Sequence, residues 1–221
     1  MTASSFSPSL DSLFRAQPET ASDHATAPAD SLESRLIRRA QAGDTAAFRT
    51  LVESHEHMVF RVCHQWLSIE EDAREACQDT FCKAWQALPA WEPRARLGTW
   101  LYQIALNQCR DRAKSRAFRQ RLATTDYGQL TAPPACPHAS PDLAAVRHDD
   151  MLKLQRGLAL LPAASRELLI LCAMEGLSYR EAAIVLKCSP RAIEGRLYRA
   201  RQLLLNWWNE LENPKGQPFD K

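Results

Sequence analysis

The chain has 221 residues, of which 45% are hydrophobic and 24% are charged, and its formal net charge is +2. This length is enough for one or two hydrophobic cores, and the composition excludes a disordered or fibrous protein. The longest apolar run, near Leu168–Met174, is too short for a membrane span. The N-terminus lacks a basic start followed by an apolar core, so we expect no signal peptide, no membrane insertion and a cytoplasmic protein.

The first thirty residues differ in composition from the rest of the chain. Residues 1–30 are rich in Ser, Thr, Ala, Pro and Asp and have no apolar period, which predicts a disordered tail. Asp30 with Glu33 predicts the start of a first helix over 31–41. Because glycines are few and alternating β-branched runs are scarce, we expect the whole chain to be all-α.

Two longer helices are expected next. Asp44 predicts the cap of a second helix that runs to Leu67. Ser68 with Glu71 has the spacing of a capping box and predicts a third helix that ends near Leu88, just before a proline.

A strongly basic helix is predicted after a short loop. The loop over 90–97 contains Trp91 and two arginines, and the fourth helix is predicted over 98–122. Residues 94–121 carry eight basic side chains against a single aspartate. Such a block indicates contact with a polyanion, although a merely solvated arginine-rich face is an open alternative.

The centre of the chain is predicted to be a flexible linker over 123–143. It contains four prolines, and residues 125–150 carry four aspartates against one arginine. Helical periodicity resumes over 144–211, which defines a second small domain after a first one over 31–122. Residues 212–221 are expected to form a loose tail.

The last quarter of the chain predicts a helix-turn-helix. Ser178 and Glu181 form a capping box for a helix to about Leu186, and after a very short turn Pro190 occupies the first position of a second helix. That helix has an apolar stripe of Ile193, Leu197, Ala200 and Leu204. Its opposite side is basic and polar, as expected of a helix that enters the major groove of DNA.

Seven cysteines are scattered without a C-x-x-C pair, which predicts reduced thiols that serve as small core residues. A metal or redox sensor is an open alternative, at Cys136 with His138 or among His55, His57, Cys63 and His64. Their spacing matches no standard zinc site, so we expect no metal and no cofactor.

Several short motifs lie in order along both predicted domains. They include Ala42-Gly43-Asp44, Gln78-Asp79-Thr80-Phe81, Thr99-Trp100-Leu101-Tyr102, Gly176-Leu177-Ser178-Tyr179 and Arg196-Leu197-Tyr198-Arg199-Ala200-Arg201. These motifs resemble those of the extracytoplasmic-function (group 4) sigma factors of bacterial RNA polymerase, within the sigma-70 family, and the resemblance covers residues 34–122 and 145–210.

The resemblance implies an initiation factor without catalytic residues, of a kind associated with stress responses. Its expected partners are core RNA polymerase, through the β′ clamp helices and the β flap, promoter DNA and an anti-sigma factor. The first domain would be region 2, which binds polymerase and melts the −10 element, and the second would be region 4, which reads the −35 element. The polymerase-binding residues would be Glu75, Gln78 and Asp79; ordinary solvated carboxylates are the open alternative.

For the −10 element, the resemblance points to the loop and to the basic helix. Trp91 in a loop beside cations suits stacking on an unpaired base, and the arginines would hold phosphates. The residues implied are Trp91, Arg94, Arg96, Trp100, Asn107, Arg110, Arg112, Lys114 and Arg116.

For the −35 element, the residues implied lie on the second helix of the helix-turn-helix. They are Arg191, Glu194, Gly195, Arg196, Tyr198 and Arg199. The chain departs from the common family pattern here, because Glu194 stands where a cation is usual. A carboxylate accepts from a cytosine amine rather than donating to guanine, so we expect an atypical −35 preference.

Two other functions compete with this interpretation. An independent helix-turn-helix regulator would share the second domain, but its first domain would need strands that this sequence does not predict. An enzyme with histidines 55, 57 and 64 in an active site lacks a supporting phosphate loop or nucleophile motif.

Overall fold

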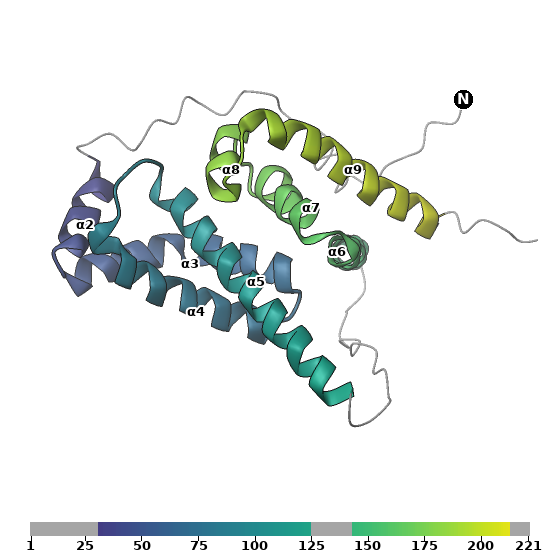
Figure 1. The fold of residues 1–221 in the computed structure, drawn as a ribbon, viewed down its shortest axis with the longest axis horizontal. Helices are drawn as coiled ribbons and strands as arrows, with labels where there is room; N and C mark the ends of the chain where they lie inside the picture. The colour runs from purple at the N-terminus through teal and green to yellow at the C-terminus, as the bar shows by residue number, and fades with distance from the viewer. Residues whose placement is uncertain (1–30, 125–142, 213–221) are drawn as a thin grey trace, which may run out of the picture. The chain divides into compact units, whose positions relative to one another are not determined.

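The computed structural model describes residues 31–124 and 143–212, which are helical apart from short connections (Figure 1). The chain divides near residue 148 into two compact units. The tail predicted over 1–30, most of the linker predicted over 123–143 and all but the first residue of the tail predicted over 212–221 lie outside the described residues.

The first unit is a bundle whose longest helices pack against one another. Its elements are α2 (Leu32–Gln41), α3 (Thr45–Leu67), α4 (Glu70–Ala87), a 3₁₀ turn η1 (Leu88–Ala90) and α5 (Leu97–Thr124). Helix α3 contacts α2, α4 and α5, and α4 also packs along α5. The buried core is apolar and includes Val59, Val62, Cys63, Ala76, Phe81, Leu101, Ala105, Leu106 and Cys109.

The caps of this unit confirm one prediction and correct two. Asp44 caps α3 as predicted, because its carboxylate accepts the backbone N–H groups of Ala46 and Ala47 at 2.9 and 3.1 Å. The cap of α2 is Ser31 rather than Asp30, since the Ser31 hydroxyl accepts the N–H of Ser34 at 3.1 Å.

The capping box predicted at Ser68 and Glu71 is wrong. Ser68 has a left-handed backbone with φ of 60° and closes α3 by donating its N–H to His64. An N-cap needs an extended backbone, which Ile69 provides instead without a side-chain cap bond. The spacing of the two residues was right for a box, but the turn between α3 and α4 is too tight for Ser68 to serve both helices.

The second unit contains the helix-turn-helix. Its elements are α6 (Leu143–Leu160), α7 (Ala163–Leu168), a π-helical stretch η2 (Leu169–Met174), α8 (Tyr179–Leu186) and α9 (Pro190–Glu212). The apolar stripe predicted on α9 is confirmed, because Ile193, Leu197, Ala200 and Leu204 are all buried. Together with Leu158 and Leu168 from α6 and α7, they form one core cluster.

Arg166 joins α6 to α7 by capping the end of α6. Its guanidinium donates to the backbone oxygens of Leu158, Ala159 and Leu161 at 2.7, 2.6 and 3.3 Å. These carbonyls lie at the C-terminal end of α6, where helix carbonyls lack i+4 partners within the helix. The cation also lies at the negative end of the α6 dipole, so it stabilises the corner in two ways.

Gln41, the last residue of α2, holds the turn that leads into the loop before α5. Its Nε2 donates to the backbone oxygens of Leu88 at 3.1 Å and of Trp91 at 2.8 Å. The Trp91 ring in turn packs against Trp100 of α5, with centroids 5.3 Å apart and an interplanar angle of 35°. One amide therefore positions a loop that is forty-seven residues away in sequence.

We expect Gln41→Met to loosen this loop, because it leaves two half-buried carbonyl groups without their donor. An unsatisfied group of this kind costs about 1–3 kcal/mol. Hydrogen–deuterium exchange of the N–H of Trp91, which donates to Leu88, should become faster while the α3 core stays protected. Arg38→Met, on the exposed side of α2, is the control; equal exchange in both variants would contradict the role given to Gln41.

Gly157 of α6 packs closely against α9. A Cβ built on Gly157 would lie 2.6 Å from Cζ3 of Trp207 and 2.8 Å from Cδ1 of Leu204. Nothing lies within 4 Å of the corresponding position on Gly195 in α9. Close packing therefore requires a glycine at 157, whereas packing places no such requirement on position 195.

The pair predicts opposite effects of the same substitution. Gly195→Ala should raise the free energy of unfolding by about 0.5–1 kcal/mol, because alanine has the higher helix propensity. Gly157→Ala should lower it by about 1–3 kcal/mol, since the Trp207 ring must move. Urea unfolding of the full chain, followed by circular dichroism, measures both; stabilisation by Gly157→Ala would contradict the packing described.

Candidate polymerase and nucleic-acid interfaces

A basic cleft lies between α4 and α5. It encloses about 520 Å³, and its lining combines an indole, two amides and several cations. The chemistry suits a nucleotide, because the indole offers a face for stacking and the cations complement phosphate. The lining residues are Lys83, Ala87, Trp100, Ile104, Asn107, Gln108, Arg110, Asp111 and Lys114.

Four of the residues predicted for −10 DNA line this cleft: Trp100, Asn107, Arg110 and Lys114. They are spaced by seven, three and four residues and so share one side of α5. The Arg110 guanidinium donates to the Asn107 side-chain oxygen at 2.8 Å, which leaves the Asn107 amide group on the exposed surface.

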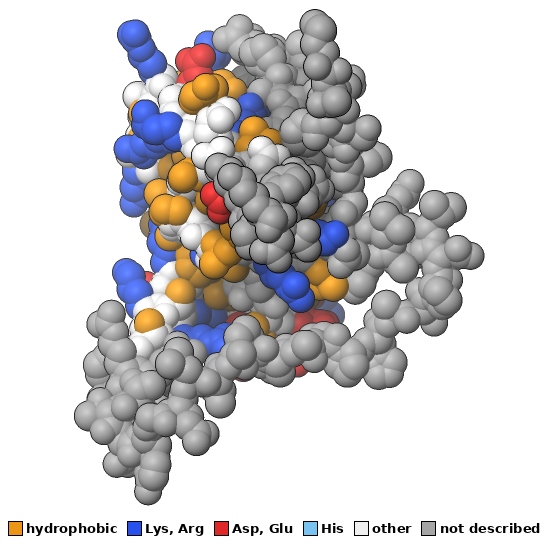
Figure 2. All heavy atoms as spheres, turned by 90° about the vertical axis from the view of Figure 1, so that its right-hand side faces the viewer, with side chains coloured by type: hydrophobic (Ala, Val, Ile, Leu, Met, Phe, Trp, Pro, Cys, Tyr) orange, Lys and Arg blue, Asp and Glu red, His pale blue; other side chains and the backbone are white. Residues whose placement is uncertain are grey.

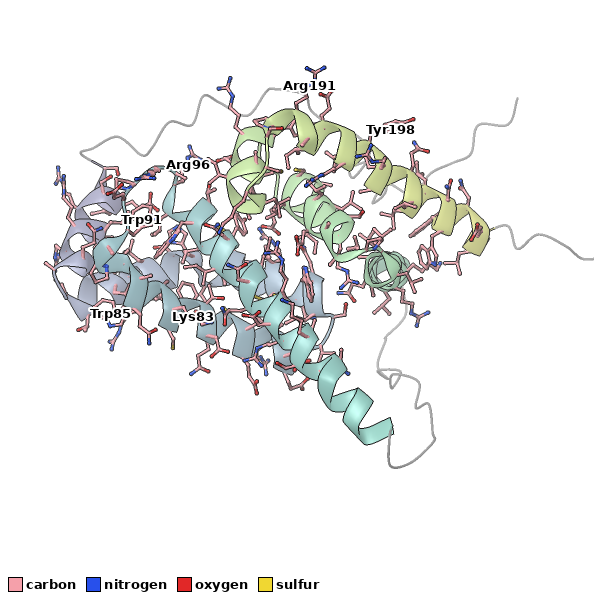
Figure 3. The ribbon with its side chains drawn as sticks, viewed as in Figure 1. Lys83, Trp85, Trp91, Arg96, Arg191 and Tyr198 are labelled. Atoms are coloured by element: carbon pink, nitrogen blue, oxygen red, sulfur yellow. The ribbon has the colours of Figure 1, made fainter. Side chains whose placement is uncertain are left out.

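The structure also brings Lys83 into the cleft, from α4 (Figure 3). The sequence analysis did not select it, because nothing in the helical pattern of α4 separates this lysine from an ordinary solvated one. A cation placed among the residues of α5 becomes evident once the two helices are packed together.

The loop residues predicted for −10 DNA lie beside the cleft. Trp91 is half-buried against Trp100, and Arg96 is half-buried just before α5. Figure 3 labels Trp91 and Arg96 in the segment that leads into α5. Arg94 is exposed and pairs with Glu92 at 2.8 Å. The two indoles therefore form a continuous aromatic surface next to the cations of the cleft.

Arg112 and Arg116 lie elsewhere, although the sequence analysis grouped them with these cations. The two terminal nitrogens of Arg112 donate to Glu75 at 2.5 Å and to Asp79 at 2.6 Å. Arg116 donates to Asp72 at 3.2 Å. Burial lowers the pKa of Arg112, but the hydrogen bonds to Glu75 and Asp79 outweigh burial and raise it overall, so the guanidinium stays charged.

The residues predicted to bind polymerase lie on the outward side of α4. The side chains of Glu75 and Asp79 are 65% and 50% exposed, so each is accessible although it pairs with Arg112. Gln78 is exposed and lines a groove between α3 and α4 of about 1,010 Å³.

This groove is apolar at its base and charged at its rim. Phe48 and Trp85 form its aromatic end, with ring centroids 4.8 Å apart. The other lining residues are Thr45, Val52, Glu53, Glu56, His57, Phe60, Glu70, Arg74, Cys77, Gln78, Phe81 and Cys82. An apolar groove with acidic residues around it is suited to a helix that carries apolar and basic side chains.

The helix-turn-helix has the local geometry predicted for it. The Ser178 hydroxyl accepts the N–H of Glu181 at 3.3 Å, and the Glu181 carboxylate accepts the N–H of Ser178 at 3.0 Å, so the capping box is confirmed. Lys187 adopts a left-handed backbone with φ of 52° and turns the chain toward α9.

The residues predicted to read −35 DNA all lie on the exposed side of α9. They are Arg191, Glu194, Gly195, Arg196, Tyr198 and Arg199. Figure 3 shows Arg191 and Tyr198 on the side of α9 away from α7, and the Tyr198 ring is 66% exposed. In Figure 2, Lys and Arg side chains line one edge of the face shown.

Of the six cysteines in the described residues, Cys63, Cys77 and Cys109 are buried, Cys172 and Cys188 are half-buried, and Cys82 is exposed. Burial raises the pKa of Cys77 and of Cys172 to about 12. The pKa of Cys63 is raised by its hydrogen bond with Cys109 and by burial. Thiols of this kind are protonated at neutral pH and are poor nucleophiles.

Two histidines of the alternative metal and active-site groupings contact neighbouring residues within the first unit. No group of three or more possible metal ligands occurs among residues 31–124 and 143–212. His55 lies between the Leu51 carbonyl at 3.0 Å and Glu33 at 3.2 Å, and His64 stacks on Phe60. Cys136 and His138 lie outside the described residues. In the described part of the chain, no helix is long and apolar enough to span a membrane.

Comparison with known proteins links both units to one family. The family profile described as Sigma-70 region 2 matches residues 51–119, and the one described as Sigma-70, region 4 matches residues 151–204. The RNA polymerase sigma factor NccH of Alcaligenes xylosoxydans xylosoxydans is 33% identical over 175 residues, covering 79% of this chain and 93% of NccH. The sigma factor CnrH of Cupriavidus metallidurans is 33% identical over 172 residues, covering 76% and 90%.

The folds agree as well. The structure of CnrH in complex with the cytosolic domain of CnrY matches with a TM-score of 0.60 at 29% identity, over 80% of this chain and 97% of that one. This match spans both units. It therefore argues against the alternative of an independent regulator, whose first domain would be unrelated to sigma factors. The chain therefore belongs to the extracytoplasmic-function group of the sigma-70 family, the non-enzymatic subunits that bind core RNA polymerase and direct it to particular promoters.

Proposed function

We propose that this sigma factor meets its partners through three surfaces. The polymerase surface consists of Glu75, Gln78 and Asp79 with the apolar groove between α3 and α4, and it binds the β′ clamp helices. Its support is the combination of exposed carboxylates with an apolar groove on the same helix. Burial of apolar side chains supplies affinity, and the carboxylates supply orientation and association rate.

The second surface is the basic cleft with the loop beside it, which takes the unpaired strand of the −10 element. Extruding a base costs a few kcal/mol, so the site must hold the base by stacking and hydrogen bonds. Trp91 and Trp100 supply the aromatic faces, Asn107 supplies a polar group, and Lys83 and Lys114 supply charge for phosphate. The convergence of these groups from α4, α5 and the loop is the observation that carries this assignment.

The third surface is the exposed side of α9, which enters the major groove of the −35 element. Arg191, Arg196 and Arg199 are exposed and able to donate to guanine or phosphate, and Glu194 is exposed beside them. The second unit also carries the contact to the β flap. We assign residues 31–122 to region 2 and 144–211 to region 4, joined by a linker over 123–143.

We also propose that an anti-sigma factor regulates the chain, and that the chain acts in the cytoplasm, where its polymerase is. The support is that CnrH, a similar sigma factor, is known in complex with another protein, the cytosolic domain of CnrY. The sigma factor RpoE of Bartonella quintana, in complex with the anti-sigma factor NepR, matches at 24% identity and is similar in fold alone.

Binding to sigma-free core polymerase tests the first surface. The purified chain should co-elute with bacterial core polymerase in one-to-one stoichiometry on a sizing column. Asp79→Arg should weaken this binding by about tenfold or more, because it turns an attraction into a repulsion. Glu210→Arg, an exposed carboxylate near the end of α9, is the matched control. Equal binding by both variants would remove Asp79 from the interface.

Selection on randomised −35 sequences tests the third surface. With Glu194→Lys, the holoenzyme should change its base preference at one or two positions of the element, because a donor replaces an acceptor in the groove. A correct contact discriminates by about 1–3 kcal/mol per base pair. Glu210→Lys makes the same charge change farther along α9 and should leave the preference as it was. An unaltered preference with Glu194→Lys would place this residue outside the groove.

A further inference from the structure

Two helices of the first unit are joined by a row of ion pairs that we name the α4–α5 ladder. It consists of Asp72, Glu75 and Asp79 on α4 and Arg112 and Arg116 on α5. The three carboxylates are spaced by three and four residues and the two arginines by four, so each set lies along one side of its helix. The ladder therefore runs along the packed boundary between the two helices.

The ladder and the basic cleft use different sides of α5. The middle of the cleft is lined by α5 residues at 100, 104, 107, 111 and 114, which recur at helical spacing, and Gln108 and Arg110 lie toward its two edges. At 100° per residue, Arg112 points about 120° away from the middle of that row, and Arg116 points farther still. Neither arginine lines the cleft. The basic run of α5 is thus divided between two surfaces that face different partners.

Arg112 is the member of the ladder that pairs with two carboxylates. Its side chain is 25% exposed, and both of its terminal nitrogens donate to carboxylates of α4 at 2.5 and 2.6 Å. Contact with a phosphate would require breaking two charge-assisted hydrogen bonds, which are about twice as strong as neutral ones. Lys114, in contrast, is exposed within the cleft.

We propose that Arg112 and Arg116 are positioning residues of the polymerase surface and make no contact with promoter DNA. Arg112 holds Glu75 and Asp79 side by side despite their like charge, so that both carboxylates face outward in a fixed arrangement. Arg116 holds Asp72 at the other end of the row. This inference rests on the proposed roles of the α4 carboxylates and of the cleft.

A physical consequence is that no other cation can take the place of the Arg112 guanidinium. The planar fork of an arginine reaches two carboxylates at once, whereas the single ammonium of a lysine cannot bridge them with the same geometry. Without the bridge, Glu75 and Asp79 lie one helical turn apart as like charges, which repel. Their side chains then spread, and the arrangement presented to the polymerase is lost.

The first measurement concerns DNA. Binding of the full chain to a fluorescein-labelled oligothymidylate is measured against salt concentration for Arg112→Gln, Arg116→Gln and Lys114→Gln. Each phosphate contact removed should reduce the slope of log K against log salt by about 0.7 on single-stranded DNA. We expect this reduction for Lys114→Gln and an unchanged slope for both arginine variants. A reduced slope for Arg112→Gln would overturn the proposal.

The second measurement concerns polymerase, with the same variants as reciprocal controls. Affinity for sigma-free core polymerase should fall about tenfold for Arg112→Gln and stay within about twofold for Lys114→Gln, although both lose one positive charge. Arg112→Lys should show an intermediate loss at an unchanged net charge. Unchanged or increased affinity with Arg112→Gln would mean that Arg112 competes with the polymerase or is irrelevant to it, and would overturn the proposal.

The two experiments separate this inference from the proposed function. If Lys114→Gln leaves the DNA slope unchanged, the assignment of the cleft is wrong. If Asp79→Arg leaves polymerase binding unchanged, the assignment of the polymerase surface is wrong. Circular dichroism shows whether Arg112→Gln remains folded, and Arg112→Lys, which keeps the charge, serves as the test if it does not.

Discussion

The packing of α5 along α4 is the contact on which the first unit depends. It buries Leu101, Ala105 and Cys109 of α5 in the shared core, and it aligns the α4 carboxylates with the α5 arginines. The same packing creates the basic cleft, because Lys83 approaches the α5 residues only when the helices lie side by side. One apolar boundary thus supports two functional surfaces of opposite charge.

These opposite charges explain how a chain with little net charge binds a polyanion and a protein. Surface ion pairs alone stabilise a fold by about 0–1 kcal/mol, so the ladder is not a main source of stability. The ladder instead pairs the carboxylates of α4 with Arg112 and Arg116, on a different side of α5 from the cations of the cleft. The cleft keeps several cations together, and the outward side of α4 keeps its carboxylates, as the proposed roles in DNA and polymerase binding require.

The second unit depends on a different kind of constraint, namely short connections with defined caps. Arg166 closes the end of α6, the Ser178–Glu181 box opens α8, and Lys187 makes the turn to α9. Each holds one corner of the unit, so the exposed side of α9 is presented as a rigid surface. The contact of Gly157 with Trp207 fixes the packing of α6 on α9. The arrangement is suited to insertion into a groove, where small changes of angle move every base contact.

The sequence by itself determined the all-α character, the apolar stripe of α9, the capping box at Ser178 and the motifs of the sigma family. These features are local, and each rests on spacing within a single helix or turn, which helical periodicity reveals directly. The prediction of a capping box failed at Ser68, because the same spacing fits the end of one helix and the start of the next. The backbone conformation that distinguishes the two depends on how α3 and α4 pack.

Only the tertiary structure decided which cations of α5 pair with carboxylates of α4 and which line the cleft. A run of arginines gives the same local signal whether a residue faces DNA or a carboxylate on a neighbouring helix. Arg112 and Lys114 are two residues apart and equally basic in sequence, yet one lies against Glu75 and Asp79 and the other lines the cleft. Gln41 and Trp91 are likewise fifty residues apart, and nothing local connects them. Long-range partners are set by the packing of apolar surfaces, which the helical pattern of one segment does not specify.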